Sequence, residues 1–145
     1  MSLTKKGSYF YGESLDDLHA VLIDYCENKY PIHHFRNAVC KCGNDTFKVN
    51  LDENAGVAER VCATCNHSHY IGDSNEYLEE AEPDEMECLC ESSTFKLTVA
   101  ISLYPESEDI KWVYLGLYCT NCGCMGCYGD WKNEFLGYKE FLNNV

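Results

Sequence analysis

The chain has few basic residues, few prolines and no long apolar run, and each shortage argues against a class of protein. Its 145 residues include 11 lysines and arginines against 24 aspartates and glutamates, so the formal net charge is −13. Nucleic-acid binders attract phosphates through basic patches, and this charge has the wrong sign for that class. Three prolines and a hydrophobic content of 46% exclude a disordered, proline-rich chain.

Membrane and export signals are also missing. No apolar stretch approaches the roughly 18 residues that a membrane-spanning helix needs. The N-terminal residues lack the apolar core of a signal peptide. We therefore expect a cytoplasmic protein with no membrane partner.

Cysteine is the residue in excess. Eleven cysteines occur, an odd number, and eight of them form four short pairs. Disulfides in a secreted protein and metal ligands in a cytosolic protein are the two explanations for such richness. The missing export signal, the odd count and the tight pairing favour metal binding.

An internal repeat organises these pairs. Residues 40–49 (CKCGNDTFKV) match residues 88–97 (CLCESSTFKL), and residues 62–65 (CATC) match residues 119–122 (CTNC). The two pairs lie further apart in the second unit than in the first. The repeat predicts three segments: an N-terminal helical segment at 1–39, a first unit with a short helix at 40–82, and a second unit with a C-terminal helix at 83–145.

Between the two cysteine pairs of each unit, alternating apolar residues predict a β-hairpin. The predicted strands are residues 47–51 and 57–61 in the first unit and residues 95–103 and 110–118 in the second. Residues 112–118 are apolar on both faces, which favours a central position in the sheet.

Helical patterns flank the hairpins. Ser14 begins a capping motif ahead of apolar residues at helical spacing, and Pro31 bounds that segment. Asp73 and Asp130 are each predicted to N-cap a helix after the second cysteine pair. The apolar face of the last helix is predicted to hold Phe135, Leu136, Tyr138, Phe141 and Leu142. We expect the helices to cover sheet faces and to join both units into one body.

A tetrahedral zinc ion bound by thiolates needs four sulfurs about 2.3 Å away, and two cysteine pairs at one end of a hairpin can supply them. The predicted metal ligands are Cys40, Cys42, Cys62 and Cys65 at the first site and Cys88, Cys90, Cys119 and Cys122 at the second. This predicts two structural Zn²⁺ ions per chain. Each ion would be saturated by thiolates, whereas catalytic zinc keeps an open position, so we expect that the chain is not an enzyme.

These cysteine pairs around a hairpin resemble the zinc-ribbon fold group. The resemblance covers residues 40–71 and 88–128, and it implies an α+β fold of two tandem zinc ribbons, small antiparallel sheets with four-cysteine zinc sites. The sequence departs from the group in two ways. The first pair of each unit is Cys-x-Cys, where zinc ribbons usually have Cys-x-x-Cys followed by glycine. The first unit keeps that glycine as Gly43, whereas the second unit has Glu91 in its place. The shorter pair leaves His67 as an alternative to Cys65 at the first site.

Three cysteines lie outside this frame. Cys124 and Cys127 could form a redox pair or a further metal-binding pair, but we expect them and Cys26 to be inert buried thiols. The aromatic residues Tyr9, Phe10 and Tyr11 could stack on a ligand, although packing at a domain edge is the expectation.

Small size, acidity and the absence of catalytic motifs together predict a protein-interaction module, such as an adaptor, an inhibitor or an immunity-type protein. Its partner would be another protein, basic in character, and we expect no nucleic-acid partner. Two alternatives stay open. One is a nucleic-acid or transcription-associated zinc ribbon, and the other is a thiol redox or metal-handling protein that uses Cys124 and Cys127.

Overall fold

The computed structural model describes residues 3–145 and has an α+β architecture dominated by antiparallel strands. The elements in chain order are β1 (Thr4–Lys6), β2 (Tyr9–Tyr11), α1 (Leu15–Tyr25), β3 (His34–Asn37), β4 (Phe47–Asp52), β5 (Val57–Cys62), β6 (Ser68–Tyr70), the 3₁₀ helix η1 (Ser74–Glu80), β7 (Asp84–Glu85), β8 (Phe95–Leu103), β9 (Ile110–Cys119), β10 (Cys124–Phe135) and α2 (Tyr138–Asn143).

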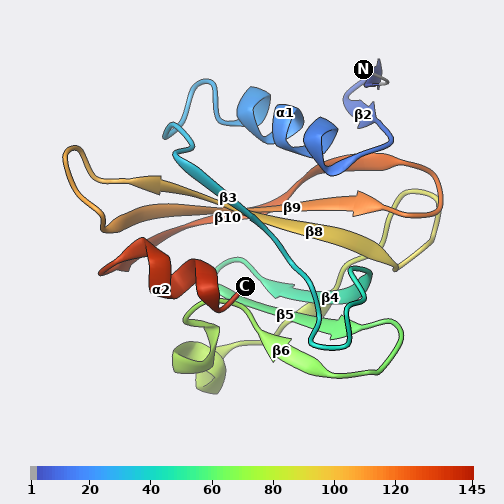
Figure 1. Cartoon of the computed structure of the whole chain (residues 1–145). Coiled ribbons are helices and arrows are strands. Elements are labelled where there is room, and N and C mark those ends of the chain that lie inside the picture. The colour runs from blue at the N-terminus through green and yellow to red at the C-terminus, as the bar shows by residue number, and fades with distance from the viewer. Residues whose placement is uncertain (1–2) are drawn as a thin grey trace.

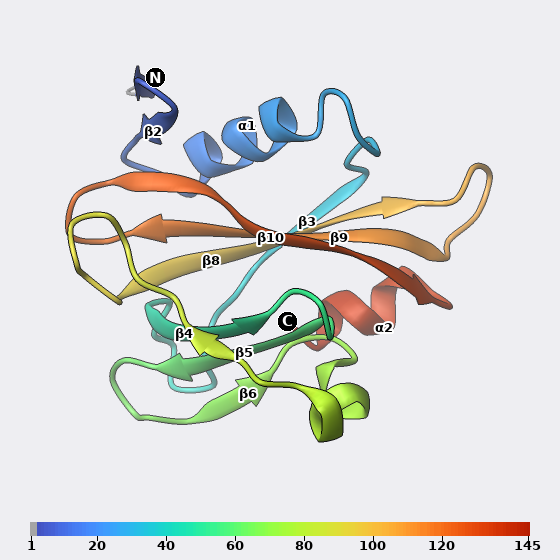
Figure 2. The same cartoon turned by 180° about the vertical axis from the view of Figure 1, so that it is seen from behind.

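The strands form one connected path in the order β1-β2-β10-β9-β8-β4-β5-β6, with β3 paired to β8 and β7 paired to β4. The link between β8 and β4 is the single pair Phe47–Phe95. Strands β8, β9 and β10 form one layer and β4, β5 and β6 form another (Figure 1, Figure 2). The two predicted small sheets are therefore connected, and they enclose a common core.

The two predicted hairpins are confirmed. In β4 and β5 the register runs from Phe47 opposite Cys62 to Asp52 opposite Val57. The alternation in the sequence places Val49 and Leu51 in the core and Lys48 in solvent. In the second unit β9 lies between β8 and β10, which is the central position predicted for its apolar run.

Helix α1 covers the outer face of the β8–β10 layer (Figure 1). The predicted cap is present, since the backbone N–H of Asp17 donates to Ser14 Oγ over 3.3 Å. Leu18 and Leu22 pack with Ala100 of β8 and Tyr114 of β9. Burial of this leucine stripe fixes the helix on the sheet, because an amphipathic helix of this length is marginal alone.

The predicted helix at Asp130 is wrong. Asp130 lies inside β10, which pairs with β9 as far as Phe135. Its carboxylate accepts hydrogen bonds from Tyr25 and Trp112 side chains over 2.8 and 2.9 Å, so it is not a helix cap. Helix α2 begins only at Tyr138, after Gly137, whose φ of 81° breaks the strand.

Two further details of these predicted helices differ. The segment after Asp73 is the 3₁₀ helix η1, and Asp73 makes no capping hydrogen bond there. Both oxygens of its buried carboxylate instead accept hydrogen bonds from Asn133 Nδ2, over 2.9 and 3.1 Å. In the C-terminal set, Leu136 is 79% exposed, whereas Phe141 and Leu142 are buried as expected.

The two units are interlocked. Strand β3, which precedes the first unit, pairs with β8 of the second, and β7 between the units pairs with β4 of the first. The C-terminal segment closes onto the first unit: the N–H of Gly72 donates to the carbonyl of Asn144 over 2.8 Å. The predicted N-terminal helical segment, in its described part at 3–39, supplies strands β1, β2 and β3 as well as a helix.

Candidate metal centres

The first cysteine pair of each unit is a tight backbone turn. The N–H of Gly43 donates to the carbonyl of Cys40 over 2.9 Å, and the N–H of Glu91 donates to that of Cys88 over 2.8 Å. Gly43 and Glu91 have φ angles of 92° and 73°, in the left-handed region. Glu91 adopts this conformation despite its side chain, so the missing glycine does not change the turn.

The second pair is built in the same way in both units. The N–H of Asn66 donates to the carbonyl of Cys62, and the N–H of Gly123 donates to that of Cys119, each over 3.0 Å. Asn66 and Gly123 again have positive φ angles, 62° and 82°. The second turns therefore share their geometry, and the hairpin returns each of them beside the first turn of its unit.

The predicted ligands gather in two clusters, Cys40, Cys42, Cys62 and Cys65 in the first unit and Cys88, Cys90, Cys119 and Cys122 in the second. In each cluster the four sulfurs lie within 4.8 Å of one another, and the first cysteine of each pair is buried while the second is exposed. Cys65, and not His67, completes the first cluster.

The sulfur spacing fits a tetrahedral metal ion. Cys40 and Cys65 sulfurs are 3.5 Å apart, as are those of Cys88 and Cys122, the equivalent pair. Four thiolates around an ion with bonds of about 2.3 Å would have edges of about 3.8 Å. A disulfide would need about 2.05 Å, and all eleven cysteines, which lie within the described residues, are free. Both clusters could therefore hold a metal ion.

Hydrogen bonds stabilise the thiolate form of one cysteine in each cluster. Cys62 Sγ accepts from the N–H of Cys65 over 3.4 Å and from Asn44 Nδ2 over 3.3 Å. The backbone bond and then the Asn44 amide lower the pKa of Cys62 to about 5, against the opposing effect of burial. In the second cluster the amide of Asn121 holds the pKa of Cys90 at about 6. The thiolate is the form that binds metal, so these donors favour metal binding by Cys62 and Cys90.

Arg60 is a component of the first cluster that the sequence did not reveal. The residue is 5% exposed on β5, and its Nη2 donates to the carbonyl of Val145 over 2.9 Å. Its guanidinium stands 4.9 Å from the centre of the Phe47 ring. Burial lowers the pKa of Arg60, and the sulfurs of Cys40 and Cys62 oppose that shift. A buried cation therefore lies near Cys40 and Cys62, two of the four sulfurs whose complex with a divalent ion would carry negative charge.

Removing that charge should weaken metal binding at the first cluster alone. We expect Arg60→Met to lower its affinity about 10- to 100-fold, the usual cost of losing an outer partner of metal ligands. The second cluster should be unaffected, because buried Leu117 holds the equivalent position of the repeat. Competition between the protein and a chromophoric chelator for Zn²⁺ measures both affinities. Lys48→Met, a matched loss of an exposed charge on β4, should change neither affinity. Equal weakening of both clusters would contradict this assignment.

The other three cysteines lie outside both clusters within residues 3–145. Cys26 and Cys124 are buried, and Cys127 donates its S–H to the carbonyl of Gly129 over 3.2 Å. Burial raises the pKa of Cys127 to about 12, so it is a neutral thiol near pH 7. Cys127 follows Cys124 by three residue steps along extended strand β10, which places their Cα atoms about 10 Å apart. That is beyond the roughly 7 Å that a disulfide tolerates. This geometry argues against a redox pair.

No protein-family model, curated protein or solved structure matches the chain. The function is therefore argued from the geometry and charge of the molecule. One structural finding bears on membranes: within residues 3–145, no helix is both long and apolar enough to cross one.

Proposed function

We propose that the chain is a zinc-binding protein-interaction module, built as two tandem zinc ribbons whose metals are structural. The observation that carries the proposal is the pair of four-cysteine clusters, each of which offers four sulfurs to one ion. An ion held by four thiolates has no open position for a substrate or a water molecule. Zinc is the metal that tetrahedral all-thiolate sites with this spacing most often select.

The charge of the chain supports a basic protein partner. The formal charge is −13 before metal binding. Four thiolates and one Zn²⁺ leave −2 at each site, so two occupied sites bring the total to about −17. A field of that sign accelerates association with a basic surface and repels phosphate backbones. Zinc-bound thiolates and the three remaining thiols persist in a reducing compartment, which supports a cytoplasmic location.

The direct test is capture of the partner. Immobilised zinc-loaded protein is exposed to lysate of the native cells at two salt concentrations, and bound proteins are identified by mass spectrometry. We expect a basic protein to be enriched and to be released as salt screens the attraction. Recovery of no specific protein at low salt would overturn the proposal. A control chain with the same net charge excludes simple ion exchange.

The alternative nucleic-acid function makes the opposite prediction. At about 0.15 M salt, where screening acts over roughly 8 Å, we expect no saturable binding to single-stranded or duplex DNA or RNA. The reason is that non-specific affinity comes from basic groups that displace counterions, and acidic residues here exceed basic ones 24 to 11. Fluorescence anisotropy of labelled oligonucleotides measures this. Saturable micromolar binding to any of them would replace the protein-interaction proposal with the nucleic-acid one.

A further inference from the structure

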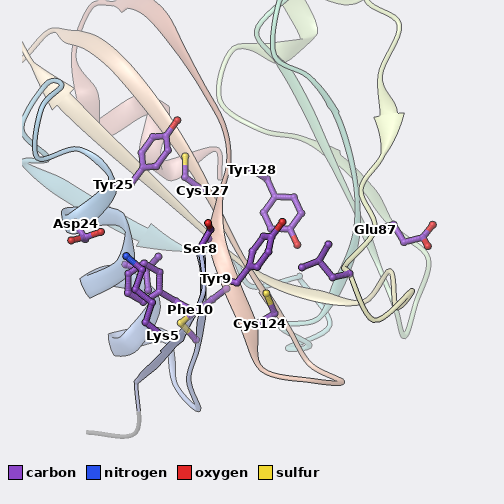
Figure 3. A pocket seen from close by; sticks show the side chains of 14 residues that line it. Lys5, Ser8, Tyr9, Phe10, Asp24, Tyr25, Glu87, Cys124, Cys127 and Tyr128 are labelled. Carbon is purple, nitrogen blue, oxygen red and sulfur yellow. The ribbon is translucent and has the colours of Figure 1, made fainter.

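An open cavity of about 580 Å³ lies beside the second cysteine cluster, and we call it the aromatic cavity (Figure 3). It is bounded by β1 and β2, by α1, by β10 and by the segment that leads into β8. The apolar side chains of its wall are Tyr9, Phe10, Val21, Tyr25, Leu89, Met125 and Tyr128. Its volume falls within the roughly 300–1,000 Å³ of ordinary ligand pockets.

The rim of the aromatic cavity concentrates exposed apolar surface. Tyr9, Tyr25 and Leu89 are 49%, 38% and 62% exposed, and each comes from a different segment of the chain. Single exposed apolar side chains need no explanation, whereas several around one hollow mark an interaction site. Tyrosine is also the residue type that interfaces favour, because its ring is apolar and its hydroxyl tolerates water.

The charge around the aromatic cavity is negative. Its lining includes the carboxylates Asp24 and Glu87 and one cation, Lys5, and Figure 3 shows the two carboxylates at opposite ends of the opening. Leu89 lies between Cys88 and Cys90, so the second cluster adjoins the wall. An ion bound there by four thiolates would leave a net −2 next to the cavity. The site therefore favours a cation over an anion or a neutral ligand.

Aromatic rings at this site already attract cations of the chain itself. Lys29 Nζ lies 4.9 Å from the centre of the Tyr25 ring, and Lys5 Nζ lies 5.1 Å from that of Phe10. A cation within about 6 Å of a ring is stabilised by the ring quadrupole. A planar guanidinium gains more than an ammonium, because it also stacks on rings and forms paired hydrogen bonds with carboxylates.

We propose that the aromatic cavity receives an arginine side chain of a basic protein partner, between the rings of Tyr9, Tyr25 and Tyr128 and within reach of Glu87 or Asp24. The proposal rests on the proposed interaction function and identifies the surface that performs it. Charge complementarity selects this occupant, since the wall is aromatic and the lining holds two carboxylates against Lys5, while the charge of nearby Lys29 is paired with Asp130 over 3.1 Å. The adjoining cluster would add negative charge on binding zinc.

The test uses a probe with one guanidinium and a neutral isostere. Zinc-loaded ¹⁵N-labelled protein is titrated with acetyl-Gly-Arg-Gly-amide and with the same peptide carrying citrulline. We expect saturable amide shifts centred on Tyr9, Gly126 and Cys127, with a dissociation constant of roughly millimolar for one anchored side chain. The citrulline peptide should bind at least about 5-fold more weakly, and a lysine peptide should fall between them. Equal binding of arginine and citrulline, shifts elsewhere on the protein, or no shifts would overturn the proposal.

Matched variants locate the site. Tyr9→Ala and Glu87→Gln should each weaken arginine-peptide binding several-fold. Tyr77→Ala removes a tyrosine of similar exposure on η1, and Glu106→Gln removes a carboxylate in the β8–β9 turn, so both should leave binding unchanged. Every variant should keep two zinc ions and the unfolding temperature of the parent, which separates loss of binding from loss of fold.

The experiments distinguish failure of the cavity proposal from failure of the proposed interaction function. If the parent protein and Tyr9→Ala capture the same partner from lysate equally well, the interaction function stands and the cavity proposal is wrong. If the arginine peptide binds the cavity while no protein is captured, the interaction function is wrong and the cation site stands.

Discussion

Cys62→Ser is expected to remove one of two bound zinc ions and to destabilise the whole chain. Cys62 is fully buried, and its sulfur accepts three N–H groups that a serine hydroxyl would meet at the wrong distance. In small modules the free energy of structural zinc binding, on the order of 10 kcal/mol, is also folding free energy. Elemental analysis of protein purified without chelator gives the metal content, and thermal unfolding gives the stability. We expect one zinc ion and an unfolding midpoint lowered by tens of degrees.

Cys127→Ser is the matched control for the loss of a thiol. Cys127 is half-buried on β10 and lies outside both clusters. The variant should keep two zinc ions, with an unfolding midpoint within a few degrees of the parent. The ligand assignment would be wrong if Cys127→Ser lost an ion, or if Cys62→Ser retained both.

The damage from Cys62→Ser should reach the second unit. Trp112 lies on β9 and Trp131 on β10, and Trp131 also packs against Gly56 of the first unit, so the fluorescence is read in a Trp131→Phe background, where Trp112 reports on the second unit. Strand β7 and the C-terminal segment connect the units through β4 and Gly72. We therefore expect the fluorescence transition of the variant to shift together with its far-ultraviolet circular dichroism. An unshifted fluorescence transition would show two independent domains.

Local signals in the sequence were enough for the hairpins, for α1 and for the grouping of the eight cysteines. Strand alternation at Phe47, Val49 and Leu51 and helical spacing after Ser14 are short-range patterns, and the cysteine pairs sit at the ends of the hairpin strands. The geometry follows directly from these patterns, because a hairpin of fixed register returns its last residue beside its first.

Strand β10 escaped prediction because its apolar pattern is interrupted where tertiary packing favours glycine. A Cβ on Gly129 would lie 2.7 Å from a methyl group of Leu51 in the other layer, so a larger residue here would have to displace the Leu51 side chain. A register shift between Cys127 and Gly129 also disrupts the period of two. The pair Gly129-Asp130 therefore resembled the start of a helix, as at Gly72-Asp73. Contacts with β9 and with Leu51, which are distant in sequence, therefore determine that this segment is a strand.

The burial of Arg60 beside the first cluster was not predicted for a different reason. Arg60 shares the core face of β5 with Ala58 and Cys62, but an arginine is expected in solvent because of its charge, and its burial was therefore not predicted. The sequence held two signals, since Arg60 alternates in phase with Cys62 and the equivalent position of the second unit is the apolar Leu117. The difference between Arg60 and Leu117 can be interpreted only in the folded structure. There the sulfurs of Cys40 and Cys62 and the carbonyl of Val145 lie near the Arg60 guanidinium.

Phe141→Ala is expected to lower the free energy of unfolding by about 3–5 kcal/mol, the usual cost of deleting a buried phenylalanine ring. Phe141 on α2 is 1% exposed and packs edge to face with Phe135, their ring centres 5.4 Å apart. The ring also lies directly on the backbone of the first unit, since a Cβ on Gly72 would come within 2.3 Å of it. The substitution thus opens a cavity where both units meet.

The loss should also affect the first metal centre. Helix α2 is followed by Asn144, whose carbonyl is contacted by the His69 ring over 2.8 Å, and by Val145, which accepts from Arg60. When α2 loosens, Arg60 loses the carbonyl of Val145 as an acceptor, and the first cluster loses part of the wall that buries its charge partner. We expect zinc to leave the first site of Phe141→Ala faster than the second when a chelator is added.

Leu142 within α2 and Leu136 just before it provide the control, because the same substitution falls on a buried and an exposed position. Leu142→Ala, at 4% exposure, should cost about 2–5 kcal/mol. Leu136→Ala, at 79% exposure, should stay within about 0.5 kcal/mol of the parent. Urea unfolding followed by circular dichroism measures all three variants against the parent. If Phe141→Ala and Leu142→Ala were as stable as Leu136→Ala, α2 would not be docked on the first unit, and the interlocked arrangement of the two units would be wrong.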